Sequence, residues 1–590
     1  MRRWLTILTV VLLSTTTAKG AELSASDLDK RRVALEDLLE EQWEYTLRTS
    51  PEFASLLGDK RYNDQVSDAS EAGIRADLEQ SKRFLRRFEA ISTVAFSDQE
   101  KLNRDLMIRN LREELEDAKF RAWQMPVTQR SGIHLGAPQF ASLLTFTSAK
   151  DYDDYITRLR KFPKTMDDTI ANMRRGMTAG LMPPKFLLEK VVGQAEGIAN
   201  QPADKTPFAL PLSRFPESIP EGERARIRTA FLDAITTAVL PSYAKFARFV
   251  RDEYAPKGRT DVGIWSLPDG AERYAVRARR STTTNLTPAE IHEIGLREVA
   301  RIEAEMLTIA RKLGFNDLKA FNASIEANPA LKAKSAQHIV DLYTQYINQM
   351  YARLPELFNR LPKAKLEVLA IPAFREQTAA GADYNTGAPD GSRPGRVNVN
   401  TYQAETRKTI TYESTAYHEG VPGHHMQLSI AQELTDLPQY RRQGGYTAFV
   451  EGWALYSERL GKEVGFYQDP YSDYGRLQDE ILRAIRLVVD TGLHSKKWTR
   501  EQVVQYFRDH SAADEQDIQS ETDRYISWPG QALAYKIGQL KILELRERAN
   551  RELGSRFDIR EFHDEVLGAG ALPLQTLEER IEAFIARKKR

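Results

Sequence analysis

The chain has 590 residues, with 84 Lys and Arg against 83 Asp and Glu, and it contains no cysteine. This length exceeds what one hydrophobic core usually supports, so we expect two helical subdomains or one large lobed unit. The balanced charge gives no indication of binding to nucleic acid or to an anionic membrane. The absence of cysteine excludes disulfides, thiolate ligands, a cysteine nucleophile and a lipid anchor on cysteine, so a metal must be held by His and carboxylate groups.

The N-terminus has the order of features typical of a secretory signal peptide. Arg2 and Arg3 precede an apolar run over residues 4–13, and small and polar residues follow up to Ala21. We expect cleavage after Gly20, which gives residues 1–20 as signal peptide and a secreted or periplasmic mature protein. No later apolar run is long enough to span a bilayer, so we expect no integral membrane segment after cleavage.

Helical periodicity dominates residues 21–260, which we interpret as an N-terminal helical lobe. Apolar residues recur there at three- and four-residue spacing, as in the stretch from Leu35 to Trp43. The stretch carries no catalytic signature. Proline and glycine cluster over residues 255–284, which indicates a boundary, and Tyr274 to Arg277 predicts a short strand.

Residues 261–590 form the predicted catalytic lobe, and its clearest helix start is a capping box. Thr287, Pro288 and Glu290 provide a cap, a proline in the first helical position and a glutamate three residues after the cap. The following apolar row predicts a helix that stops at Gly314.

A small antiparallel β-sheet is expected within about 366–401, directly before the most histidine-rich stretch. Residues 366–371 and 396–400 have the pattern of strands, and the loop between them is rich in Gly, Pro, Asp and Asn. An edge strand beside a metal site can pair with an extended peptide, so Val397, Asn398 and Asn400 are candidate substrate-binding residues. A purely structural hairpin is the alternative.

The next stretch concentrates histidine and glutamate. Residues 417–427 read Tyr-His-Glu-Gly-Val-Pro-Gly-His-His-Met-Gln. A catalytic zinc needs three His or carboxylate ligands, an open position for water and a nearby carboxylate base. His418 is the first candidate ligand and Glu419 the candidate base. The next histidines come six and seven residues later, whereas the common zinc helix spaces its histidines by four.

The helix must therefore be interrupted if a later histidine shares a metal with His418. In an unbroken helix His425 would lie about 10 Å further along the axis, too far for one ion. Two glycines and a proline lie within residues 420–423, and such residues break or bulge helices. A bulge of two residues would bring in His424, which we favour, and a bulge of three would bring in His425.

A second helix would supply the third ligand. We expect the two zinc helices at about 413–434 and about 446–460. Glu451 follows His424 by 27 residues, which leaves room for a helix, a turn and a returning helix. Its apolar and small neighbours distinguish it from an ordinary solvated glutamate. Glu458, two turns further along, is the reserve ligand.

Three polar residues follow one another at four-residue steps on an otherwise apolar helix: Arg486, Asp490 and His494. Such a row can orient a metal ligand through its second ring nitrogen. It can equally be a structural ladder of ion pairs, and the sequence leaves both interpretations open.

Candidates for contact with a substrate follow near the C-terminus. Residues 524–531 read Arg-Tyr-Ile-Ser-Trp-Pro-Gly-Gln and precede a helix with Tyr535 and Lys536. A zinc peptidase needs a hydrogen-bond donor for the developing oxyanion; Tyr525 is the first candidate and Tyr535 the second. Arg524 or Lys536 could bind the C-terminal carboxylate of a peptide.

Taken together, these stretches resemble the bacterial family known as domain of unknown function 885. The resemblance rests on residues 417–427, 449–458, 489–494 and 524–531, in that order, and on the similar segments 267–270 and 282–288. It covers nearly all of the mature chain. The family in turn looks like a branch of the mostly helical zinc peptidases that include angiotensin-converting enzyme, thimet oligopeptidase and the Taq-type carboxypeptidases.

The resemblance implies a mostly α fold, with a two-lobed helical shell around a deep channel and zinc at its floor. Carried over by position, His418 and His424 match the zinc histidines, Glu419 the general base and Glu451 the third ligand. The extra residues between the histidines depart from the pattern of the related peptidases and leave the choice between His424 and His425 open.

These features predict an exported metallopeptidase that binds one Zn²⁺ per chain and cleaves short peptides. Glu419 would take a proton from zinc-bound water and later return it to the leaving amine. A buried channel would admit short peptides only, so we expect an oligopeptidase or a carboxypeptidase. One alternative is a zinc amidase acting on cell-wall peptides or amino-acid conjugates. Another is a non-catalytic peptide-binding protein with a vestigial metal site.

Overall fold

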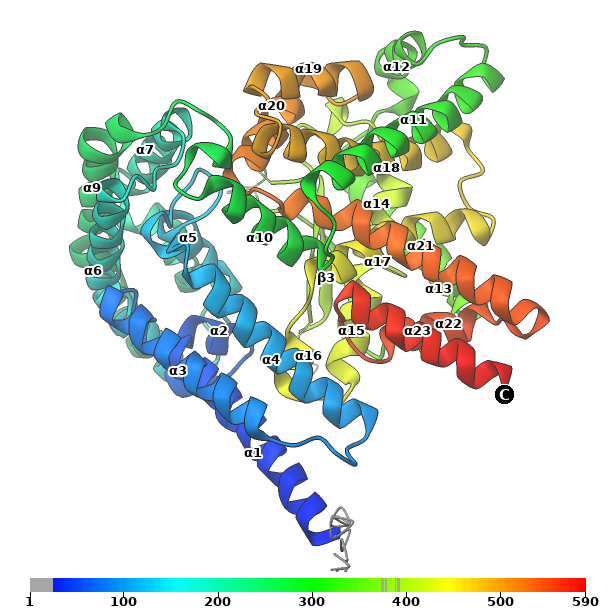
Figure 1. Ribbon diagram of the computed structural model, residues 1–590. Helices are drawn as coiled ribbons and strands as arrows, with labels where there is room; N and C mark the ends of the chain where they lie inside the picture. Colours follow the sequence, from blue (N-terminus) through cyan, green and yellow to red (C-terminus); the bar gives the residue numbers. More distant parts are fainter. Residues whose placement is uncertain (1–24, 373–375, 377–378, 388, 390–392) are drawn as a thin grey trace, which may run out of the picture.

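Helices make up most of the protein, in a computed structural model that describes residues 25–372, 376, 379–387, 389 and 393–590 (Figure 1). The mostly α fold class is therefore confirmed. The predicted signal peptide lies outside the described residues. Within the described ranges, none of the helices has the combination of length and apolar character that crossing a bilayer requires.

The first nine helices follow one another along the left side of Figure 1. They are α1 (Ala25–Thr49), α2 (Pro51–Leu56), α3 (Glu71–Ala90), α4 (Asp98–Ala118), α5 (Ile133–Leu143), α6 (Ala149–Thr178), α7 (Lys185–Ala199), α8 (Glu221–Ala234) and α9 (Leu240–Phe249). Helices α5 to α9 bury a core of their own, which contains Tyr152, Phe231 and Tyr243. A second, smaller core lies between α1, α3 and α4.

The later helices occupy the rest of the molecule. They are α10 (Gly270–Thr282), α11 (Pro288–Lys312), α12 (Leu318–Ala327), α13 (Ala336–Leu357), α14 (Tyr412–Glu419), α15 (His424–Glu433), α16 (Gln439–Gln443), α17 (Thr447–Glu463), α18 (Pro470–His494), α19 (Arg500–His510), α20 (Glu515–Ser527), α21 (Ala534–Leu553), α22 (Ile559–Leu567) and α23 (Leu574–Lys589). Helix α18 packs along α11, and α17 packs along α21. The division into two lobes near residue 260 stays a prediction.

The predicted capping box is confirmed, and the nearby predicted strand is wrong. Thr287 caps α11, its side chain accepts from the backbone of Glu290, and the helix ends at Lys312. Tyr274 to Arg277 lie inside helix α10, where Tyr274 and Val276 are buried. Tertiary packing decides here over the strand preference of these two residue types.

The small sheet is mixed, and our expectation of an antiparallel sheet is wrong in one pairing. Strand β3 (Gly395–Val399) pairs in parallel with β1 (Leu366–Ala370) and antiparallel with β2 (Ala382–Asn385). The strand order is β1-β3-β2. The strands expected from the sequence exist, but β2, which we took for part of their connecting loop, supplies the antiparallel partner. β3 therefore lies in the centre of the sheet and has no free edge.

Two glycines set the distance between α17 and α21. A Cβ atom on Gly538 would lie 1.8 Å from the carbonyl oxygen of Ala448 and 2.8 Å from Cα of Gly452. Any side chain would have to push the two helices apart. Because α17 carries Glu451, this contact also positions a residue of the site described below.

Replacement of Gly538 by alanine is expected to lower the free energy of unfolding by about 2 kcal/mol or more, because the new methyl group overlaps the backbone of α17. Gly193→Ala is the matched control, since a Cβ at that helical position meets no atom within 4 Å. It should leave the stability unchanged or raise it by up to about 1 kcal/mol. Thermal unfolding followed by circular dichroism tests both variants, and equal melting temperatures would contradict the packing argument.

Candidate metal centre

The helix is interrupted between the two histidines expected to share a metal. α14 ends at Glu419 and α15 begins at His424. Between them, the Val421–Pro422 peptide bond is cis, and Gly423 has a ψ of −127°. A Cβ atom on Gly423 would lie 2.0 Å from the carbonyl oxygen of His418, so only glycine fits there. The predicted departure from helix geometry is confirmed.

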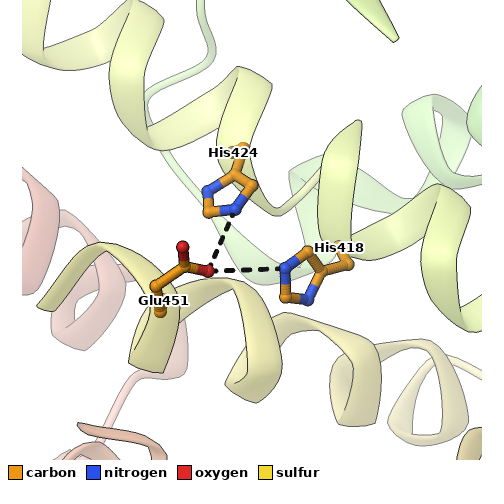
Figure 2. A group of neighbouring side chains, drawn as sticks. All are labelled: His418, His424 and Glu451. Carbon is orange, nitrogen blue, oxygen red and sulfur yellow. Dashed lines mark ion pairs between the residues drawn. The ribbon is translucent and has the colours of Figure 1, made fainter. Parts of the chain in front are cut away.

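This interruption brings His418 and His424 together with Glu451 of α17 (Figure 2). Oε2 of Glu451 lies 3.7 Å from Nε2 of His418 and 3.4 Å from Nε2 of His424. The three ligand atoms all lie within 4.8 Å of one another. Four-coordinate zinc with bonds of about 2.0–2.2 Å separates neighbouring ligand atoms by about 3.3–3.6 Å. The three side chains could therefore hold a metal ion with small adjustments.

The electrostatics of this group favour a positive charge. Burial acts to lower the pKa of His418, but hydrogen bonds to Glu451 and Glu458 outweigh it and raise the pKa to about 10. Burial acts to raise the pKa of Glu451, but His418 and His424 hold it well below its usual value. The carboxylates thus stabilise a cation between them, as a proton or as a metal ion.

Two further side chains hold the histidine rings in place. Oε1 of Glu458 lies 2.7 Å from Nδ1 of His418, on the side of the ring away from Glu451. The carboxamide nitrogen of Gln427 lies 2.9 Å from Nδ1 of His424 and donates to the carbonyl oxygen of Val450. Glu458, our reserve ligand, therefore contacts the candidate ligand His418 and is not one of the three converging side chains. The role of Gln427 was not predicted from the sequence, although its position three residues after His424 places both on one face of α15.

The charges of His418, His424 and Glu451 also act on the carboxyl group of Glu419, the last residue of α14. Burial raises the pKa of its carboxyl group, His418 and His424 act to lower it, and Glu451 and Asp383 add to the increase. A carboxylate with a raised pKa beside a metal centre is suited to accept a proton and give it back.

His425 is not part of the group. Its Nδ1 lies 3.0 Å from the hydroxyl of Tyr384, and its Nε2 lies 3.2 Å from the carbonyl oxygen of Ala364. Both ring nitrogens thus have partners on the side of the sheet. The alternative ligand of the sequence analysis instead connects α15 with strand β2.

The polar row of α18 does not contact the three ligands. Asp490 accepts from the hydroxyl of Tyr274 at 2.6 Å and from the backbone nitrogen of Gly530 at 3.1 Å. His494 lies between the backbone nitrogen of Ile264 and the carbonyl oxygen of Tyr525. Arg486 donates to Tyr525 and Glu521. Within the described residues only Arg486 of the three has an ion pair, so the row has structural contacts but is not the ladder of ion pairs that we considered.

The two tyrosine candidates differ in what their hydroxyl groups do. Tyr525 is fully buried, donates to Glu521 and accepts from Arg486. The hydroxyl of Tyr535 accepts from Arg524 at 3.2 Å, which leaves its own hydrogen available. Tyr525, our first candidate for the oxyanion donor, thus has no hydrogen left to donate, and Tyr535 remains.

Lys536 is also occupied. Its ammonium group is fully buried and lies 2.7 Å from Glu480 and 2.9 Å from Glu298. The expectation that it binds a peptide carboxylate is wrong, because two carboxylates already neutralise it. Arg524 is more open: its contact with Glu521 is 3.3 Å long, and its Nε is buried without a hydrogen-bond partner within the described residues.

The substrate strand proposed from the sequence is wrong as well. β3 is hydrogen-bonded on both sides, so Val397 cannot pair with a peptide, and its side chain is fully buried. The amide of Asn398 donates to Asp383 and Asn385 of β2. The amide of Asn400 donates to backbone oxygens at positions 376, 379 and 380. These residues stabilise the sheet and its loop, and the outer strand nearest α14 is β2.

Two solved structures have the same fold. A "putative lipoprotein from Colwellia psychrerythraea" shares 29% of its residues with the chain, over 94% of this chain and 99% of that one, with a TM-score of 0.90. A "putative lipoprotein of unknown function from Shewanella oneidensis" shares 19% over the same proportions, with a TM-score of 0.70. A "putative oligoendopeptidase F from Bacillus anthracis" has 12% identity and a TM-score of 0.29, over 87% of this chain and 97% of that one. This similarity is too low to support a conclusion.

No curated protein is similar to the chain. The family described as "Bacterial protein of unknown function (DUF885)" matches residues 51–581, which is most of the chain and includes the whole metal centre. The resemblance found in the sequence is thereby confirmed, and the chain belongs to the DUF885 family of bacterial proteins.

Proposed function

We propose that the protein is an exported zinc-dependent metallopeptidase that hydrolyses short peptides. One observation carries the proposal: His418, His424 and Glu451 converge at ligand distances, and Glu419, a second carboxylate with a raised pKa, follows His418 directly in the chain. Two imidazoles and one carboxylate with a neighbouring base are the donor set of many catalytic zinc sites. The residues present therefore fit a zinc ion.

His418, His424 and Glu451 would hold the ion. When bound there, zinc lowers the pKa of a water molecule and polarises a substrate carbonyl group. Glu419 accepts the proton of that water and later delivers it to the nitrogen of the leaving amine. The C–N bond breaks, the hydroxyl group of the water stays on the carbonyl carbon, and Glu419 returns to its initial state.

The supporting side chains fit this role. Nδ1 of His418 can donate its proton to Glu458, which leaves Nε2 free for a metal. The same tautomer of His424 requires Gln427 to present its carboxamide oxygen to Nδ1, so the side chain would have to reorient and give up its hydrogen bond to Val450. Tyr535 is our candidate for the donor that stabilises the oxyanion.

Strand β2 is our candidate for holding the peptide backbone. It is an outer strand, it packs against α14, and its Asp383 acts on the pKa of Glu419. Pairing through backbone hydrogen bonds holds peptides with little dependence on their side chains. This suits an enzyme that accepts many short sequences.

Export is proposed from two observations. The N-terminal sequence has the features of a signal peptide, and the two related solved structures are described as those of a "putative lipoprotein". We therefore propose a secreted or periplasmic protein.

Glu451→Gln is expected to abolish stoichiometric zinc binding. Removal of a side chain that supports a ligand already lowers the affinity for metal about 10- to 100-fold. Removal of a ligand should therefore lower this affinity about 100-fold or more. Metal analysis of protein purified without chelators, followed by zinc titration, measures the effect. His425→Gln is the matched control at a neighbouring histidine, and it should keep one zinc per chain. If His425→Gln alone lost the zinc, the assignment of the ligands would be wrong.

Glu419→Gln is expected to keep the zinc and to lose activity by about 10²- to 10⁴-fold, because the amide cannot accept the proton. Cleavage of a short-peptide library, read by mass spectrometry, measures the loss. Glu463→Gln, at the far end of α17 where the carboxylate pairs with Arg546, is the control. Unchanged activity in Glu419→Gln would refute the mechanism, and cleavage of peptidoglycan fragments in place of peptides would favour the amidase.

A further inference from the structure

Two arginines, Arg486 of α18 and Arg524 of α20, lie against the ring of Tyr535. Nη2 of Arg486 lies 3.0 Å from Glu521, and Nη1 of Arg524 lies 3.3 Å from the same carboxylate. Both guanidinium groups lie over the ring of Tyr535, at 4.7 and 6.0 Å from its centroid. Arg130 adds a third positive charge, close enough for Arg524 and Glu521 to act on it.

These three arginines, with Glu521, form what we call the arginine cluster, and its charges do not balance. Glu521 is ionised: burial acts to raise its pKa, but Arg486 and Arg524 lower it to about 2. One carboxylate thus faces three guanidinium groups. Nε of Arg524 is buried without a hydrogen-bond partner within the described residues. The cluster has the capacity to accept a further anion.

Arg130 is the least neutralised member of the cluster. Its guanidinium group makes no ion pair and no hydrogen bond with the described part of the chain. Arg130 is exposed as a residue, but burial of its guanidinium group and the charge of Arg524 both lower its pKa, so a like charge lies near it. A second guanidinium group beside one that already shares Glu521 with Arg486 is stabilised by a further anion, and the planar donors of arginine match a carboxylate.

The loop that carries Arg130 is held firmly against α20. Its turn closes with a 2.8 Å hydrogen bond from Thr128 to Ser131. The side chain of Gln129 donates to the carbonyl oxygen of Asp523 at 3.0 Å and to Ser527 at 3.3 Å. These contacts fix Arg130 beside the turn of α20 that carries Arg524. The backbone of this loop is therefore already ordered, which lowers the entropic cost of binding an anion there.

The cluster lies within reach of the metal centre. Arg483 lies one helical turn before Arg486 on α18, and its Nη2 is 3.9 Å from Glu458, the carboxylate behind His418. Arg486 of the cluster therefore lies about 5 Å along the helix axis from Arg483, the arginine that contacts Glu458. A peptide with about 3.4 Å per extended residue spans such a distance with a few residues.

We propose that Arg130 and Arg524 bind the C-terminal carboxylate of a short peptide whose scissile bond lies at the metal centre. The enzyme would then release residues from the C-terminal end and reject peptides whose C-terminus is amidated. This inference rests on the proposed peptidase function and narrows it to the carboxypeptidase type.

The test compares binding of N-acetyl-tetra-alanine as the free acid and as the C-terminal amide, by calorimetry with the zinc-loaded Glu419→Gln variant. The acid should bind at least about 10-fold more tightly. In this background, Arg130→Gln should weaken binding of the acid by about 10- to 100-fold and that of the amide by less than about 2-fold. Arg524→Gln should act in the same direction, and Arg130→Lys should restore part of the preference.

Arg160→Gln is the matched control, since this exposed arginine of α6 has one ion pair, 3.8 Å long. It should change neither affinity. Equal binding of acid and amide, binding of neither, or an acid preference that survives in Arg130→Gln would each overturn the inference. Because Arg130 has no partner to lose, its variant should fold normally.

The two proposals fail in different ways. Wild-type protein that prefers the acid but cleaves no peptide would refute the peptidase function and leave the carboxylate site standing. Wild-type protein that cleaves acid and amide at equal rates would refute the carboxylate site alone.

Discussion

The candidate metal centre depends on one constraint: two imidazole rings six residues apart must face the same point. A continuous helix cannot do this, so the chain ends α14 after His418 and restarts at His424. The same helix that supplies Glu451 also fixes the interruption, because the indole nitrogen of Trp453 donates to the carbonyl oxygen of Pro422 at 2.8 Å. The first two ligands and the third are thus positioned by one contact between the turn and α17.

Charge is concentrated around the first ligand. The ring of His418 lies between Glu451 on one nitrogen and Glu458 on the other, and Arg483 and Asp479 extend the ionic chain into α18. Burying several ionised groups costs free energy, which a hydrophobic replacement would avoid. This cost is justified if the buried charges orient His418 to bind a cation. Such a role also explains why a helix-rich interior contains so many acidic residues at this place.

Local features of the site could be predicted from the sequence, and contacts between distant segments could not. The helix interruption follows from two glycines and a proline within residues 420–423, and the ligand on α17 follows from its apolar neighbours. Strand β2 was missed because its residues, Ala-Asp-Tyr-Asn, lack an apolar alternation. Lys536 was misinterpreted because its partners, Glu298 and Glu480, come from other helices. Polarity along one helix does not reveal what faces it.

The positions of the site's parts along the chain have a consequence for how the protein folds. The ligands and Glu458 all belong to the contiguous segment from α14 to α17, and His418 and Glu458 are 40 residues apart. The contact that holds Arg130 beside α20 joins residues 394 positions apart. Closing the longer loop costs more conformational entropy and comes later in folding. The metal centre is therefore expected to be ordered first, and the arginine cluster is completed only when the N-terminal helices dock.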